Sequence, residues 1–81
     1  MIIVGKLTST LEEQVETLDG GLNATIILTT DVQCEISIND NLNYQTYEPG
    51  ELIPLQDRKG IISNLYYKTL TGTAIIRYWL Y

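Results

Sequence analysis

The chain contains no histidine and no phenylalanine, and it has only one cysteine and two prolines among 81 residues. Without histidine, acid–base catalysis would fall to carboxylates, tyrosine or lysine, and a Cys–His nucleophile is excluded. One cysteine can form no intramolecular disulfide and supplies too few soft ligands for zinc. Cys34 lies in the alternating run VQCEISI, so we expect it to be buried as a small hydrophobic residue. We therefore predict a protein that is not an enzyme and that holds no metal or cofactor.

Positive charge is also scarce, with 5 basic against 10 acidic residues and a net charge of −5. Nucleic-acid binding needs clustered Lys and Arg, and anionic membranes attract the same residues. The one adjacent pair, Arg58-Lys59, is interpreted as part of a solvated loop. The acidic residues are spread along the chain, which does not favour mimicry of DNA. We expect neither a nucleic-acid partner nor a membrane.

Long apolar runs are absent, and no stretch approaches the roughly 20 residues that span a bilayer. The start, MIIVGKLT, lacks the positive region of a signal peptide. Hydrophobic residues make up 44% and charged residues 19% of the chain, as in a folded globular protein. We predict one domain over residues 1–81, made in the cytoplasm.

What the sequence does have is alternation with a period of two, which is typical of half-buried strands. The polar turn NDN at 39–41 predicts that 32–48 is a hairpin. Pro54 removes a ladder donor, which places 51–55 at a sheet edge or a bulge. The segments 61–69 and 73–81 flank LTG and are predicted to form a second hairpin. The pattern indicates an all-β fold, an antiparallel β-sandwich of about seven or eight strands, with a jelly roll as one arrangement.

The first twenty residues leave two alternatives open. Thr10 and Glu13 fit a capping box, and Leu11, Val15 and Leu18 fit a helical stripe. Val15 is, however, a weak helix former, and so short a helix is marginal in water. We favour an extended segment at 13–18 that turns into a strand at 22–30. In the preceding strand, 2–8, Gly5 is a candidate bulge.

Carboxylates offer little chemistry, because most of them stand singly at turns. The cluster Glu12-Glu13-Glu16 is interpreted as a solvated surface. The NDN turn could supply oxygen ligands to calcium, but that ion needs six to eight converging oxygens, so turn formation explains these residues better.

The last strand is apolar on both faces. One face carries Ala74, Ile76, Tyr78 and Leu80, and the other carries Ile75, Arg77, Trp79 and Tyr81. A strand that is apolar on both faces is usually covered on both. In the predicted second hairpin, Tyr66 and Ile62 would share the outer surface. We predict a protein interface made of these residues: Ile75, Trp79, Tyr81, Tyr66 and Ile62.

Two other readings of this surface stay open. In the first, the N-terminal segment of the same chain covers this surface. In the second, the aromatic rings of this surface stack on a glycan. Aliphatic neighbours favour protein contacts over sugar stacking.

The segments LNATIILTTDVQCEISINDN, YEPGE and TGTAIIRYWLY together resemble the small β-sandwich virion proteins of tailed bacteriophages. These include capsid decoration, head-fibre and tail or baseplate components, and the resemblance covers residues 14–81 as a pattern. It implies a non-enzymatic role in a virion, with a homo-oligomer or a larger assembly as the partner. A carbohydrate-binding module and a phage-encoded inhibitor of a host protein are the alternatives.

Overall fold

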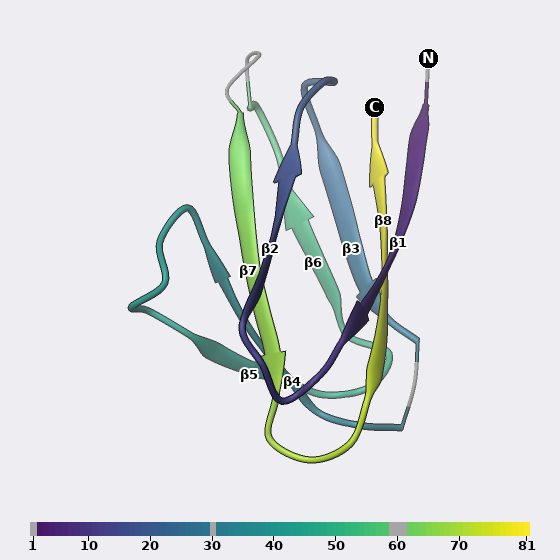
Figure 1. The fold of residues 1–81 in the computed structure, drawn as a ribbon. Helices are drawn as coiled ribbons and strands as arrows, with labels where there is room; N and C mark the ends of the chain where they lie inside the picture. Colours follow the sequence, from purple (N-terminus) through teal and green to yellow (C-terminus); the bar gives the residue numbers. More distant parts are fainter. Residues whose placement is uncertain (1, 30, 59–61) are drawn as a thin grey trace.

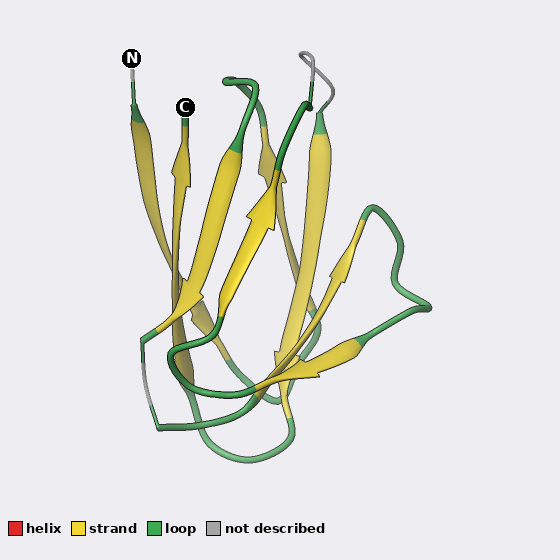
Figure 2. Ribbon diagram, turned by 180° about the vertical axis from the view of Figure 1, so that it is seen from behind, coloured by secondary structure: helices red, strands yellow, loops and turns green. Residues whose placement is uncertain are grey.

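The computed structural model describes residues 2–29, 31–58 and 62–81, and this part of the chain forms strands, turns and loops with no helix. Eight strands lie in two four-stranded antiparallel sheets (Figures 1 and 2). Sheet A has the order β1-β8-β3-β6 and sheet B the order β2-β7-β4-β5. The strands are β1 (Ile3–Ser9), β2 (Gln14–Leu18), β3 (Ala24–Leu28), β4 (Cys34–Ile38), β5 (Gln45–Tyr47), β6 (Leu52–Leu55), β7 (Ser63–Thr69) and β8 (Ala74–Leu80).

The connections cross from one sheet to the other at every step except the β4–β5 hairpin. This is the strand order of an eight-stranded jelly roll, so the predicted antiparallel sandwich is confirmed. The loops after β1, β5 and β7 gather at one end of the sandwich, and both chain ends lie at the other (Figure 1).

The two inner faces enclose a single hydrophobic core. Strand alternation turns every second side chain inward. Along β7, buried and half-buried residues alternate from Ser63 to Thr69. The buried hydrophobic residues are Leu7, Leu18, Ala24, Ile26, Leu28, Cys34, Ile36, Ile53, Leu65, Tyr67, Ala74, Ile76 and Leu80. Burial of Cys34 is therefore confirmed. Its thiol donates to the carbonyl of Lys68 at 3.3 Å, and burial raises the pKa of that thiol.

The ambiguous segment after Thr10 is extended, because residues 14–18 form β2. The helical alternative would place Val15 and Leu18 on one buried stripe. In the strand, Leu18 is fully buried and Val15 is 53% exposed. Pro54 lies in β6, which pairs only with β3, so its predicted edge position is also confirmed.

The predicted hairpin of 61–69 with 73–81 is wrong. Strand β7 pairs with β2 and β4 in sheet B, whereas β8 pairs with β1 and β3 in sheet A. The loop between them crosses the end of the core and is closed by a hydrogen bond from the Thr69 hydroxyl to the Gly72 carbonyl at 2.7 Å. Both strands carry an apolar inner face, so they stabilise the core from opposite sides instead of pairing.

The predicted bulge at Gly5 is also absent. The register of β1 with β8 is continuous from Ile3↔Leu80 to Ser9↔Ala74, and Gly5 lies opposite Tyr78. A Cβ at residue 5 would collide with the Tyr78 ring. Glycine at this position therefore makes room for an aromatic side chain across the strand pair.

Arg58 does not lie in a solvated loop, which corrects the interpretation of Arg58-Lys59; Lys59 falls outside the described residues. The Arg58 side chain is 5% exposed. Its guanidinium donates to the carbonyls of Leu18 at 2.5 Å and Gly20 at 2.7 Å. The backbone N–H of Arg58 donates to Leu22 at 2.7 Å. Arg58 thereby attaches the β6–β7 connection to the β2–β3 turn, using a buried charge that is bound to backbone oxygens.

Candidate functional site

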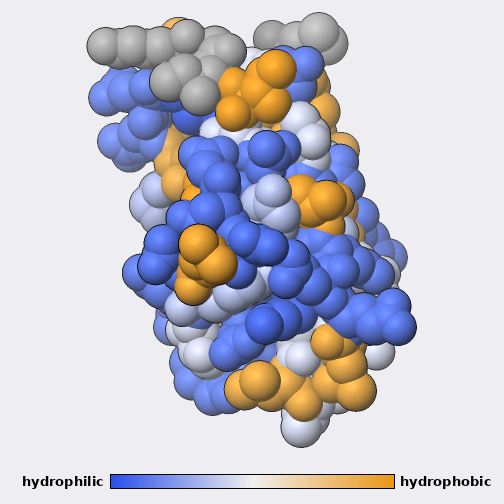
Figure 3. All heavy atoms as spheres, turned by 60° about the vertical axis from the view of Figure 1, so that its left-hand side comes forward, coloured by the Kyte–Doolittle hydropathy of each residue, from blue (hydrophilic) through white to orange (hydrophobic). Residues whose placement is uncertain are grey.

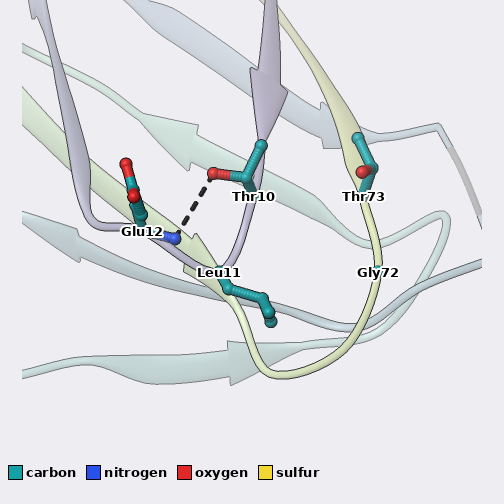
Figure 4. A pocket seen from close by; sticks show the side chains of 5 residues that line it. All are labelled: Thr10, Leu11, Glu12, Gly72 and Thr73. Atoms are coloured by element: carbon teal, nitrogen blue, oxygen red, sulfur yellow. Dashed lines mark hydrogen bonds between the residues drawn. The ribbon is translucent and has the colours of Figure 1, made fainter.

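A shallow pocket is found among the residues that the structure describes. It has a volume of about 380 Å³ and lies between the β1–β2 and β7–β8 loops (Figure 4). Its lining residues are Thr10, Leu11, Glu12, Gly72 and Thr73. The Thr10 hydroxyl accepts from the Glu12 N–H at 3.3 Å, and Glu12 is the single titratable side chain in the lining. One carboxylate without a second acid, base or nucleophile offers no catalytic arrangement.

Metal ligands do not converge either. Within residues 2–29, 31–58 and 62–81, no three Cys, Asp or Glu side chains gather in a way that could hold an ion. The NDN turn instead forms the predicted turn geometry, with Asn39 at φ 68°. Asp40 accepts the N–H groups of Leu42 and Asn43 at 3.0 Å and the Ser37 hydroxyl at 2.8 Å. These bonds hold the pKa of the Asp40 carboxyl far below its ordinary value, so the carboxylate is used to stabilise the turn.

None of the described residues belongs to a helix long and apolar enough to cross a membrane.

The outer face of sheet A, here called the A-face, is the most distinctive surface. Alternation turns Trp79 outward on β8, and the register places Val4 of β1 on one side of it and Thr25 of β3 on the other. The next row along the strands is formed by Lys6, Arg77 and Ile27. With the edge strand β6 included, the A-face consists of Val4, Lys6, Thr8, Thr25, Ile27, Leu52, Pro54, Ile75, Arg77, Trp79 and Tyr81.

Several apolar side chains of the A-face are open to solvent. Val4 is 57% exposed and Leu52 is 62% exposed, while Trp79 and Ile75 are half-buried. The N-terminal segment 3–9 does not lie over this face, because it is the edge strand β1 of the same sheet. The alternative that this segment covers the face is therefore wrong. Apolar side chains gathered on one exposed face are a feature of interaction sites.

Tyr81 is fixed in place at the corner of the A-face. Its main-chain oxygen accepts the N–H groups of Leu22 at 2.9 Å and Asn23 at 2.7 Å, and its N–H donates to Asn23 at 2.9 Å. Gly21, at φ 70°, allows this contact because a Cβ there would lie 2.8 Å from the Tyr81 nitrogen. The Tyr81 hydroxyl lies 3.0 Å from the Thr25 hydroxyl. The ring is thus held on the face by four hydrogen bonds to the β2–β3 connection and β3.

Two basic side chains lie side by side on the A-face, one on the edge strand β1 and one on β8. Lys6 and Arg77 are direct cross-strand partners and both are exposed. Like charges placed opposite each other destabilise a sheet. The outward side chains of the four strands include no carboxylate, and in the described part of the molecule the ion pair found is Lys68–Glu35, on the other sheet. The A-face therefore carries two unneutralised cations on a chain with a net charge of −5.

The five predicted interface residues do not form one surface. Ile75, Trp79 and Tyr81 come together on the A-face. Tyr66 lies on β7 in sheet B, and the exposed Ile62 precedes that strand. The separation follows from the corrected hairpin, because β7 and β8 present their outer faces to opposite sides of the sandwich.

The outer face of sheet B, here called the B-face, is more polar. Tyr66 lies between Val15 and Ser37 in the register, and Lys68 lies beside Glu35, with a 3.8 Å ion pair. The Lys68 amine is also 4.4 Å from the centre of the Tyr44 ring. Figure 3, which brings this side of the molecule forward, shows a mostly hydrophilic surface with hydrophobic side chains in separate spots.

Glu13 adds negative charge to the B-face. The Tyr44 hydroxyl is buried beside the Glu13 carboxylate. Burial, together with this neighbouring acid, raises the pKa of Tyr44 to about 12. The B-face therefore combines tyrosine rings with two acidic groups, Glu13 and Glu35.

Sequence reasoning missed the A-face residues that come from other strands: Val4, Lys6, Thr8, Thr25, Ile27, Leu52 and Pro54. Alternation along each strand shows that the side chains of these residues point outward. It does not say which strands are neighbours in the sheet, and that information would have been needed to place them beside Trp79.

Comparisons of the chain with protein-family models, with curated protein sequences and with solved structures found no match.

Proposed function

We propose that this protein is a non-enzymatic structural component that assembles with copies of itself through the A-face, as a virion protein of a tailed bacteriophage. The proposal combines the site geometry with the pattern-level resemblance to small β-sandwich virion proteins. Sheet faces provide its binding surface, and no cleft is involved.

The observation that supports it most directly is the set of exposed and half-buried apolar side chains on the A-face. Val4 lies beside Trp79 in one row, and Ile27 lies beside Leu52 in the next row. Exposed apolar area of this kind is costly in water and is removed by association. Trp and Tyr at the centre of such a surface are the residues that most often dominate binding energy.

A glycan platform is less well supported by the same residues. Sugar rings stack on flat aromatic surfaces that are bordered by polar side chains. On the A-face, Val4 lies beside Trp79, and Ile27 and Leu52 form an aliphatic pair in the next row. These aliphatic side chains suit contact with another polypeptide.

Sedimentation velocity on the purified chain tests the proposal with two matched variants. Leu52→Asp places a charge on the A-face, and Leu42→Asp places the same charge on a leucine that is 83% exposed in the β4–β5 loop. We expect the wild type and Leu42→Asp to associate with rising concentration and Leu52→Asp to remain monomeric, with circular dichroism unchanged in all three. A wild type that stays monomeric at about 500 µM, a concentration chosen for a small interface, would contradict self-assembly.

The virion assignment has its own test in the gene neighbourhood. Genes for head or tail proteins beside this one would support it, and a neighbourhood without phage genes would contradict it.

A further inference from the structure

We propose that the partner of the A-face is the B-face of a second copy of the chain, so that molecules join head to tail. This inference rests on the proposed function, because it assumes that the A-face mediates self-association. It goes further by naming the surface that the A-face binds and the symmetry of the contact.

Charge argues against a contact between two A-faces. Each A-face carries Lys6 and Arg77 and, among its outward strand residues, no carboxylate. Two such faces packed together would place four cations in one interface with no opposite charge. Burial of unpaired charge is strongly unfavourable, so a symmetric A–A dimer is disfavoured.

The remainder of the same chain has the opposite charge. With the two A-face cations set apart, the net charge of −5 leaves −5 − 2 = −7 for the other residues. On the B-face, Glu13 and Glu35 supply negative charge, and Lys68 neutralises part of it through its ion pair with Glu35. A second copy therefore offers a sheet face that complements the cations of the A-face.

The two faces also match in the spacing of their rows. On the A-face, the apolar row of Val4 and Trp79 lies two residues along the strands from the basic row of Lys6 and Arg77. On the B-face, the row of Val15 and Tyr66 lies two residues from the row of Lys68 and Glu35. Glu13, two residues before Val15 and beside the same Tyr44 ring as Lys68, extends this second row, so that two carboxylates and one amine give it a net negative charge.

Side chains two positions apart on a strand are separated by about 6.7 Å. Because this separation is common to both faces, apolar and charged rows can meet at the same time. Tyr66, which the sequence predicted at the interface, then contacts a partner although it lies on the other sheet from Trp79.

The size of the face sets the strength that we expect. Four strands spaced about 4.8 Å apart and three rows spaced about 6.7 Å apart give a face of about 19 by 20 Å. The area of such a face is smaller than the roughly 800 Å² that each partner buries in a standard interface. A single contact should therefore be weak. A head-to-tail contact repeats, giving rings or open chains. Closure into a ring strengthens an assembly of weak contacts, because the contact that closes the ring forms within one assembly.

A mixing experiment tests the head-to-tail contact. Leu52→Asp disables the A-face and leaves the B-face intact. Val15→Lys does the reverse at a position that is 53% exposed, because it adds a positive charge that repels Lys6 and Arg77 of the A-face. We expect each variant alone to be monomeric in sedimentation velocity. Mixed in equal amounts they should form a 1:1 dimer that grows no further, because each molecule retains one working face.

The outcomes separate this inference from the proposed function. If the wild type associates and Leu52→Asp does not, but the mixture stays monomeric, the head-to-tail contact is overturned and self-association through the A-face stands. Association of Val15→Lys alone at the wild-type level would also overturn it. A monomeric wild type would remove the proposed function first and this inference with it.

Salt dependence gives a second readout. Raising NaCl from about 0.05 M to about 0.5 M screens exposed charge pairs, and we expect the wild-type Kd to rise about tenfold. A Kd that falls or stays constant over this range would overturn the pairing of Lys6 and Arg77 on the A-face with the net acidic row of Glu13, Lys68 and Glu35 on the B-face.

Discussion

The aromatic ring of Tyr78 occupies the space above Gly5, its direct partner across the β1–β8 pair. A side chain at residue 5 would have to share this space with Tyr78. The edge strand of sheet A is therefore packed against β8 through a residue that has no side chain. This relationship leads to the first prediction.

Gly5→Ala should destabilise the fold by about 1–3 kcal/mol, the usual cost of overpacking. Urea unfolding measures the change in free energy. The double variant Gly5→Ala with Tyr78→Leu provides the control, because the smaller side chain makes room for the methyl group. The two substitutions should couple, with a combined cost below the sum of the single ones; simple additivity would mean that the ring does not set the requirement for glycine.

Arg58→Met should destabilise the fold by about 2–3 kcal/mol, because charge-assisted bonds are lost and the carbonyls of Leu18 and Gly20 lose a buried donor. The matched control is Arg77→Met, in which the same change is made at an exposed arginine and should alter stability by less than about 0.5 kcal/mol. Arg58→Lys should recover only part of the loss, since an amine lacks the fork that reaches both oxygens. Equal effects at the two arginines in urea unfolding would contradict the role given to Arg58.

The thiol of Cys34 should react with Ellman's reagent only after unfolding. It is 1% exposed, and burial raises its pKa above the ordinary 9.0, so both access and the thiolate fraction are low. The reaction should be slow in native buffer and complete within the mixing time in concentrated urea. Rapid reaction of the native protein would contradict the burial of this side chain.

The same shift has a consequence for stability at high pH. The folded state holds the Cys34 thiol neutral. The stability that the neutral thiol contributes to the fold is therefore complete below pH 9.0 and is lost as the pH rises through the pKa of the folded state. Cys34→Ala should therefore lose less stability than the wild type between neutral and alkaline pH. The comparison of the two proteins separates the effect of the thiol on the pH dependence of stability from the effect of the tyrosines, whose own pKa values are raised by burial.

Asp40 should remain ionised at acidic pH, where an ordinary aspartate is largely protonated. The N–H groups of Leu42 and Asn43 and the Ser37 hydroxyl donate to its carboxylate and lower its pKa. Since the folded pKa is depressed, the stabilisation is present above the ordinary value of 3.8 and is lost as the pH falls through the folded pKa.

NMR titration of the Asp40 carboxyl carbon measures this directly. Asp40→Ala should speed hydrogen exchange at the Leu42 and Asn43 amides, while the amides of β7 keep their protection. A carboxyl that titrates near 3.8 would show that these bonds do not hold the turn.

Local signals were sufficient for most of the individual strands. Alternation identified the inward residues of β8 and β4, and the short NDN sequence identified the β4–β5 turn, because these features depend on neighbours in the chain. The position of Pro54 at an edge followed from its missing N–H. Gly5 was misread as a bulge because the reason for it lies on β8, about seventy residues away in the sequence.

The candidate site was predicted in part for the same reason. Ile75, Trp79 and Tyr81 lie on one strand, so alternation alone places them on a common face. Tyr66 was assigned to that face through a hairpin that does not form. Four residues between β7 and β8 permit either a hairpin or a crossing to the other sheet, and the local sequence does not distinguish them.

The sequence by itself determined the all-β class, the two-sided apolar character of the last strand and the absence of histidine chemistry, because composition and a period of two act within each segment. The tertiary structure decided which strands are neighbours. Burying the inner faces of β7 and β8 against each other required them to lie in opposite sheets. That arrangement placed Val4 and Thr25 beside Trp79, aligned Lys6 with Arg77, and turned Tyr66 to the far side of the molecule.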